Sequence, residues 1–353
     1  MSGVVRPDAT AVVPDPAEAS SVHARGFFGT IEGGSLTLDR FESVYLLETR
    51  RLELVDERGR AAEWPKLFRS AARADPSFGV RYVVYRDLRQ RGYVVRSSPP
   101  PVSFTVLPRG GVLHKTPSRY WVEVQSERVP FDLAGLLELA DRTQGAKKSL
   151  LLAVVDEESD LTYYRIRKPS PSGALETTAL SSPTIGWLSG DRVVVFDPPA
   201  VEALGRERSY GSVIGDRLEV SLLEADFLRS SGQLEIRDAG SGRTVPPTRF
   251  ARRARKVETG FDERKEAYRV LRDRRLIVKT GFKYGAHFRA YPRNPERAHA
   301  RYLIQAVDVA HRAPWPEVAG NVRVAQGVRK EFVIAAVSRS APVRFLSLER
   351  VRP

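Results

Sequence analysis

Few side chains in this sequence can transfer a proton near neutral pH, and none of them is a cysteine. The lack of cysteine removes thiolate nucleophiles, thiolate zinc sites and disulfide bonds from consideration. Metal binding would fall to His, Asp and Glu, but no two histidines have the close helical spacing of a zinc protease. We therefore expect neither a metal nor another cofactor. The five histidines are His23, His114, His287, His299 and His311.

Three residues of the C-terminal half, Tyr291, His299 and Lys330, form a set that suits RNA cleavage. In that chemistry a general base takes the proton of a 2′-OH, which attacks the adjacent phosphate, and a general acid protonates the departing 5′-oxygen. A cation stabilises the charge on the phosphorane. An imidazole suits the acid role near neutral pH, and an ammonium group acts as a point charge on phosphate oxygens. Taken singly, each residue is more often a core, rim or surface residue than a catalytic one.

An internal repeat organises the chain around these residues. Gly29 and Gly211 lie 182 positions apart in the similar segments 28–31 and 210–213. Similar offsets relate 52–56 to 234–238, 85–89 to 268–272, and 144–148 to 326–330. A constant offset of this kind indicates a duplicated unit. We expect a first copy over residues 8–167, a linker rich in Ser, Pro, Thr and Gly over 168–189, and a second copy over 190–353.

The two copies differ at the three candidate positions. The first copy has Leu107 and Pro117 where the second has Tyr291 and His299, and it keeps a lysine, Lys148, at the place of Lys330. Because leucine and proline cannot transfer protons, the first copy is predicted to be a catalytically silent scaffold.

The periodicity of each copy indicates an α+β fold. A short β segment with a glycine turn leads into a helical stretch and then a basic amphipathic helix. In the second copy, β-branched runs follow at 276–278, 288–291, 302–309 and 332–337, with a helix at 317–327. We predict a tandem repeat of two similar units, each a small N-terminal α/β subdomain plus a C-terminal mixed-sheet, nuclease-like subdomain. The nuclease subdomain of the second copy is expected over about 260–353.

The charge of the chain favours a polyanionic partner. The 353 residues carry 57 Lys and Arg against 43 Asp and Glu, for a net charge of +14. Basic side chains that neutralise phosphates release counterions and so bind nucleic acid. Residues 249–279 alone hold 12 Lys or Arg against 5 Asp or Glu, a plausible surface for an RNA backbone. No run of about 18 apolar residues could span a membrane, so we expect a cytoplasmic protein without a membrane partner.

Two blocks of the second copy form a specific pattern around the three candidate residues. The first is 278–291, VKTGFKYGAHFRAY, and the second is His299 with 322–330, VRVAQGVRK. Together these blocks resemble two motifs of the tRNA-splicing endonucleases of the archaeal type. The sequence departs from the family pattern at His287 and Ala300, where the family usually has Asp and Ser.

The resemblance implies a complete reaction. Tyr291 would be the general base, His299 the general acid and Lys330 the group that stabilises the phosphorane. The substrate would be a precursor tRNA with a bulge-helix-bulge fold at the exon–intron junctions, and the products a 2′,3′-cyclic phosphate and a 5′-OH. Arg323 would clamp a bulge base, together with either Arg344 or Arg350. A chain with one silent and one active copy resembles the homodimeric subclass of the family.

An acidic segment in the silent copy has a docking role by the same resemblance. Four acids gather within five residues, between two apolar runs that look like the strands of a hairpin. The alternative is a solvated hairpin tip. In the family such a loop enters a basic pocket of another unit and holds the assembly together. The four residues are Asp156, Glu157, Glu158 and Asp160.

Two other functions remain as alternatives. A non-catalytic RNA-binding or assembly subunit would have the same basic faces but no turnover. A metal-dependent nuclease would need clustered carboxylates, and a chelator would abolish its activity.

Overall fold

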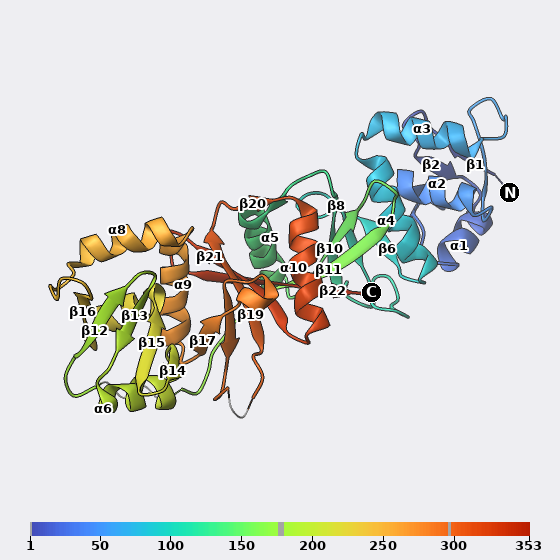
Figure 1. Cartoon of the computed structure of the whole chain (residues 1–353). Helices are drawn as coiled ribbons and strands as arrows, with labels where there is room; N and C mark the ends of the chain where they lie inside the picture. The colour runs from blue at the N-terminus through green and yellow to red at the C-terminus, as the bar shows by residue number, and fades with distance from the viewer. Residues whose placement is uncertain (1, 176–179, 296–297) are drawn as a thin grey trace. The chain divides into compact units, whose positions relative to one another are not determined.

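A computed structural model describes residues 2–175, 180–295 and 298–353. The chain forms two compact units, and the colours of Figure 1 follow it from the first to the second. The first unit comprises Met1–Pro130, Glu138–Ile166 and Arg350–Pro353, and the second comprises Phe131–Leu137 and Arg167–Glu349. Each unit has its own large hydrophobic core.

The N-terminal subdomains of the two copies have the same sheet topology. In the first the strand order is β3-β4-β2-β1-β5, and in the second it is β14-β15-β13-β12-β16. Both sheets are antiparallel except at one pair, β1 with β5 and β12 with β16. The strands of the first sheet are β1 (Ser2–Val5), β2 (Ala11–Val13), β3 (Thr30–Glu32), β4 (Ser35–Leu38) and β5 (Glu53–Val55). Those of the second are β12 (Thr184–Ser189), β13 (Arg192–Val195), β14 (Ser212–Ile214), β15 (Arg217–Ser221) and β16 (Leu234–Asp238).

Each of these sheets is accompanied by helices in matching order. The first set is α1 (Pro16–Ala24), α2 (Arg40–Glu48), α3 (Trp64–Ala74) and α4 (Phe78–Gln90). The second set is α6 (Pro198–Ala200) continuing into the π-helix η1 (Val201–Glu207), α7 (Leu222–Ser230), α8 (Pro247–Val257) and α9 (Phe261–Asp273). Both α2 and α7 begin with a capping box, which satisfies the free N–H groups of a helix start.

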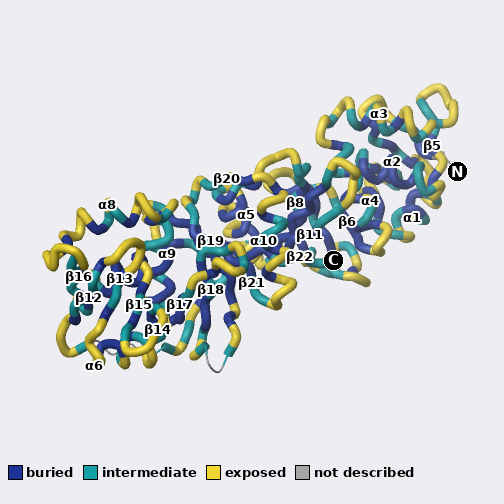
Figure 2. Tube along the Cα trace, in the orientation of Figure 1, coloured by how far each residue is buried: buried dark blue, intermediate teal, exposed yellow. Residues whose placement is uncertain are grey.

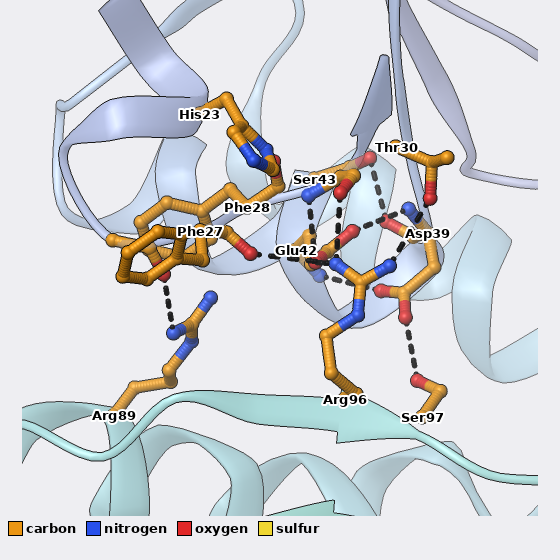
Figure 3. Close-up of polar contacts among 12 residues, drawn as sticks. His23, Phe27, Phe28, Thr30, Asp39, Glu42, Ser43, Arg89, Arg96 and Ser97 are labelled. Carbon is orange, nitrogen blue, oxygen red and sulfur yellow. Dashed lines mark hydrogen bonds and ion pairs between the residues drawn. The ribbon is translucent and has the colours of Figure 1, made fainter. Parts of the chain in front are cut away.

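The glutamates of these capping boxes also fix a glycine loop in the same way in both copies. The Oε1 atom of Glu42 accepts the N–H of Gly29 at 2.9 Å, and that of Glu224 accepts the N–H of Gly211 at 2.8 Å. Both glycines have positive φ and touch backbone so closely that a Cβ would not fit. Figure 3 shows Glu42 together with Arg96, which lies 3.0 Å from it. Burial is the main reason that the pKa of Glu42 is raised to about 7.

The C-terminal subdomain of each copy is a five-stranded mixed sheet with a crossover helix. The second copy has the order β17-β18-β19-β21-β22, with β19 and β21 parallel. Its elements are β17 (Ile277–Thr280), β18 (Phe288–Tyr291), β19 (Tyr302–Asp308), α10 (Trp315–Gly327), β21 (Glu331–Val337) and β22 (Arg344–Val351). Those of the first copy are β6 (Val95–Ser97), β7 (Phe104–Val106), β8 (Tyr120–Ser126), α5 (Leu133–Gly145), β10 (Ser149–Val155) and β11 (Leu161–Arg167).

The central strands of the second copy form the floor of its core. Val333 and Ala335 of β21 and Ile304 of β19 are fully buried, and Leu271 of α9 belongs to the same cluster. Figure 2 shows these strands as largely buried segments. The mixed α+β fold and the duplication are therefore confirmed.

The segment expected to be a linker is only partly one. Residues 184–189 form β12, a strand of the second sheet, so the second copy begins earlier than residue 190. Upstream of it, Gly173 and Leu175 donate backbone N–H groups to the carbonyls of Arg274 and Arg275, at 2.9 and 3.0 Å. This part of the chain thus packs onto the second copy.

A short piece of the first copy also belongs to the second unit. The strand β9 (Phe131–Asp132) pairs with β20 (Arg312–Ala313), and the Phe131 ring lies 5.6 Å from that of Trp315. Phe131 and its partner Ala313 occupy equivalent positions in the two copies, 182 residues apart.

Candidate active site

The end of β18 and the segment before β19 carry the first two candidate residues. Tyr291 is the last residue of β18, and His299 lies three residues before β19 begins. The backbone N–H of Arg301 donates to the carbonyl of Ala290 at 3.0 Å. This bond brings the segment with His299 beside the end of β18 that carries Tyr291.

Lys330 lies at the same edge, on the opposite side of β19 from Tyr291. It directly precedes β21, and the N–H of the next residue, Glu331, donates to the carbonyl of Arg301 at 2.9 Å. The N–H of Lys330 itself donates to the carbonyl of Ala325, at the C-terminal end of α10. The three candidate residues are therefore gathered at one edge of the sheet by backbone hydrogen bonds.

The surroundings of the three side chains differ. Tyr291 is buried against Ile277, Ala300 and Leu175, with only 8% of its surface exposed. His299 is exposed. The Nζ atom of Lys330 donates to the carbonyl of Val328 at 3.2 Å. One buried and one exposed proton-transfer group beside an ammonium group is an arrangement that can act on a phosphodiester at the surface.

Two contacts to this edge were not expected from sequence. Leu175 comes from the segment before the second copy and packs against the cluster of Ile277, Tyr291 and Ala300. The ring of Tyr284 lies 5.5 Å from the Lys330 ammonium group, within the range of a cation–π interaction. Tyr284 belongs to the motif at 278–291, so the sequence could have indicated that it lies near the candidate site. Leu175 lies in a Ser- and Pro-rich stretch without any periodic pattern, so the sequence did not indicate its contact.

The first copy reproduces this edge without the proton-transfer groups. Arg119 donates its N–H to Val106 at 2.8 Å, and Ser149 donates to Arg119 at 3.0 Å, as Arg301 and Glu331 do in the second copy. The same register puts Leu107 and Pro117 at the places of Tyr291 and His299. Lys148 there donates its Nζ to the carbonyl of Ser118 at 2.7 Å.

His287 lies at the opposite end of β18, away from Tyr291. Its Nδ1 accepts the backbone N–H of Ala306 at 3.1 Å. Burial, aided by the charge of Arg264, lowers the pKa of His287 to about 4, so its imidazole is neutral at pH 7. At the equivalent place in the first copy, the Ser103 hydroxyl accepts the N–H of Val124. His287 therefore has a structural role as a hydrogen-bond acceptor.

The candidate RNA-binding arginines lie at different distances from the edge. Arg323 is exposed on the last two turns of α10, the helix that leads to Lys330. Arg344 pairs with Ala336, near the far end of β21 from Lys330. Arg350 belongs to the end of β22 that groups with the first unit.

The acidic segment forms the turn between β10 and β11, as expected for a hairpin. The Asp156 carboxylate accepts the N–H groups of Glu158 and Asp160, at 3.0 and 2.8 Å. Glu157, Glu158 and Asp160 are exposed. Arg128 lies 2.9 Å from Glu157 across the exposed surface. The turn is thus a preformed acidic projection of the first unit.

The described residues contain neither a cluster of metal ligands nor a membrane-spanning helix. No three His, Asp or Glu side chains within them are placed to share one metal ion. No helix within them is long and apolar enough to cross a membrane.

Comparisons with known proteins bear on this site. The family model described as "tRNA intron endonuclease, catalytic C-terminal domain" matches residues 78–163 and 261–345, and the model for the N-terminal domain of the same family matches 5–68 and 184–250. The tRNA-splicing endonuclease of Methanosarcina acetivorans is 34% identical over 337 residues, covering 94% of this chain and 95% of that protein. The tRNA-splicing endonuclease of Halobacterium salinarum is 33% identical over 350 residues, covering 94% of each chain. The chain therefore belongs to the tRNA-splicing endonuclease family, as an enzyme that acts on introns in precursor tRNA.

Proposed function

We propose that this enzyme cuts precursor tRNA at bulge-helix-bulge junctions by metal-independent attack of a 2′-OH on the adjacent phosphate. The observation that carries this proposal is the difference between the two copies. Both form the same sheet edge with the same backbone hydrogen bonds and a lysine, and only the second adds a phenol and an imidazole there. The products would be a 2′,3′-cyclic phosphate and a 5′-OH.

Each residue of the edge has a role in this reaction. Tyr291 takes the proton of the 2′-OH, and His299 returns one to the 5′-oxygen as the P–O bond breaks. Lys330 stabilises the negative charge of the phosphorane. Arg323 stacks on an unpaired bulge base, because a guanidinium plane stacks well on an unstacked base. Arg344 lies near the remote end of β21, which favours Arg350 as the second stacking arginine.

The proposed assembly is a homodimer with the acidic turn as its dock. The turn, Asp156, Glu157, Glu158 and Asp160, would enter a basic pocket in the second unit of the partner chain. A pocket of about 560 Å³ in that unit is the candidate receptor, with Arg192, Arg264, Lys279 and Arg289 in its walls. The same walls carry Asp191, Glu219, Glu224 and Glu258, so the turn would have to approach the cations selectively.

The reaction is tested by incubating the purified protein with a bulge-helix-bulge RNA in excess EDTA and analysing the ends of the fragments. We expect cleavage at both junctions, with 2′,3′-cyclic phosphate and 5′-OH ends. Loss of cleavage with EDTA, restored by a divalent cation, would show a metal-dependent nuclease. Tight binding without cleavage under any condition would show an RNA-binding subunit.

A further inference from the structure

The surface between α3 and α4 of the first copy differs from the equivalent surface between α8 and α9 of the second copy. In the first copy, an aromatic cluster fills the space between α3 and α4. The ring of Phe68 lies 5.3 Å from that of Trp64 and 5.9 Å from that of Tyr82. Phe68 also contacts Phe78 at 5.4 Å. This corner of the silent copy is an extension of its hydrophobic core.

The second copy has none of these three aromatic side chains at the equivalent positions. Pro247, Ala251 and Lys265 stand where the first copy has Trp64, Phe68 and Tyr82. The space left open is a groove of about 640 Å³. Its cationic lining comes from α7, α8 and α9 and consists of Arg229, Arg252, Arg255, Lys256 and Lys265.

A buried carboxylate supports the floor of this groove. Asp226, with a fully buried side chain, stands where the first copy has the core residue Val44. Its Oδ2 lies 2.8 Å from the Nζ of Lys265, and its Oδ1 accepts a hydrogen bond from Arg229. Burying a carboxylate is costly unless it is paired, so this Asp is present together with the cations that it holds. Arg229 in turn replaces the apolar Leu47.

The charges of the groove are only partly balanced. Five cations line it, and two carboxylates pair with them: Asp226 as described, and Asp262 with Arg255 at 2.8 Å. Arg252 and Lys256 are exposed one turn apart on α8, a helix with exposed stretches in Figure 2. A row of exposed cations over an open groove matches a chain of phosphates rather than a single small anion.

We propose that this groove is a second RNA-binding site, which holds the phosphate backbone of the precursor tRNA away from the cleaved bond. The proposal rests on the proposed function for its substrate. The N-terminal end of α9 borders the groove, and its C-terminal end leads to β17, where Ile277 pairs with Tyr291. The 13 residues of α9 span about 20 Å. The groove therefore lies about 20 Å, the length of α9, from the end of the sheet that carries Tyr291, and only an RNA that extends this far from the cleaved bond would contact it.

The matched variants come from the repeat itself. Arg252→Ala with Lys256→Ala removes two cations of the groove, and Arg69→Ala with Arg73→Ala removes the cations at the same two positions of the silent copy. Ala251→Phe fills the groove with the side chain that the first copy has there. Each variant is first shown to keep the thermal midpoint of the wild type.

Binding is measured with a full-length intron-containing precursor tRNA and with a short bulge-helix-bulge duplex, across a salt series. We expect the groove double variant to bind the full-length RNA roughly tenfold more weakly, with a salt slope smaller by about 2, because two phosphate contacts are lost. Its affinity for the short duplex should stay at the wild-type level. Ala251→Phe should weaken binding in the same direction, and the silent-copy variant should not.

Two results would overturn the proposal. An equal loss in the silent-copy variant would show a general effect of net charge. An unchanged affinity for full-length RNA would remove the groove from RNA binding, and a changed oligomeric mass in that case would assign it to an acidic protein surface. Since binding is measured without cleavage, failure here is distinct from failure of the EDTA experiment, which tests the reaction alone.

Discussion

The two copies of this chain share a scaffold and differ in what is placed on it. Arg89 and Arg272, at equivalent positions, are both buried and lie over aromatic rings, Phe28 and Tyr210, at 3.9 and 4.0 Å. Such matched contacts show what the fold itself requires. Residues that differ on an unchanged backbone, such as Pro117 and His299, show what function adds.

Lys148 and Lys330 show that one position can serve both the fold and the candidate site. Lys148 remains in the copy without Tyr and His, and its Nζ bonds the carbonyl of Ser118. A lysine at this position thus has a structural contact that does not depend on catalysis. The presence of Lys330 is therefore weaker support for catalysis than the presence of Tyr291 or His299.

The largest effect should come from removing the general acid of the second copy. His299→Ala is expected to lower the rate of cleavage by about two or more orders of magnitude, while RNA affinity changes little because many phosphate contacts remain. Single-turnover kinetics at saturating enzyme would measure it. Pro117→Ala, at the equivalent position of the silent copy, is the matched control and should cleave normally. An active His299→Ala would remove His299 from the reaction.

A smaller loss is expected from Arg323. Arg323→Ala should weaken cleavage of bulged RNA by roughly 1–3 kcal/mol, the scale of one base stack. Arg323→Lys should restore little, since lysine lacks the planar group. The equivalent residue of the first copy is Asp141, so Asp141→Ala serves as the control. Full rescue by lysine would indicate a phosphate contact in place of stacking.

The acidic turn is a feature of the first copy alone, because the second copy has no acid at the equivalent hairpin turn. Replacing Asp156, Glu157, Glu158 and Asp160 with Asn or Gln should weaken the dimer by about tenfold at low salt, with a parallel fall in cleavage. Light scattering across a dilution series would follow the mass. A variant that remains dimeric and fully active would show that the turn is only a solvated hairpin tip.

The smallest effect on cleavage should come from His287→Ser, which introduces the residue of the silent copy, Ser103. Cleavage at pH 7.5 should be nearly unchanged. The folded-state pKa of His287 is about 4, below the ordinary value of about 6.5. The unfolded chain therefore takes up a proton first as the pH falls, and the wild type loses stability between pH 6.5 and 4.

Over this pH range the variant should lose roughly 1–2 kcal/mol less free energy of unfolding than the wild type. The figure is smaller than the full pKa shift would give, because solvent partly screens the half-buried His287. Thermal midpoints of both proteins from pH 4 to 7 would measure the difference. Parallel curves would contradict the assigned pKa, and an inactive variant would contradict the structural role of His287.

Much of the architecture could be predicted from the sequence because the same pattern of strands and helices occurs in both copies. The strands at 288–291 and 302–309 and the helix at 317–327 lie within two residues of β18, β19 and α10. The constant offset also placed Tyr291, His299 and Lys330 opposite their silent counterparts. The pairing of β18, β19 and β21 then brings these residues to one end of the sheet. Sequence spacing alone does not show this closeness.

Other features depend on contacts that no periodic pattern encodes. The strand β12 was missed because residues 184–189 follow a Ser- and Pro-rich stretch, and its partner β16 lies about 50 residues later. The groove on α8 was visible in sequence only as an excess of charge over 249–279. Its shape depends on Phe68 being replaced by Ala251, which becomes meaningful once α3 and α8 are known to be equivalent helices.

The packing of residues 173–175 on the second copy sets where this chain could be divided into two polypeptides. Gly173 lies so close to the backbone of Arg275 that a Cβ would fall 2.2 Å from its carbonyl oxygen, and Leu175 packs against the cluster that contains Tyr291. A gene split at the repeat boundary, near residue 184, would leave this segment on the wrong product and uncover the tyrosine. A split near residue 168 would keep it with the catalytic half, so the natural point of division lies ahead of the duplicated unit.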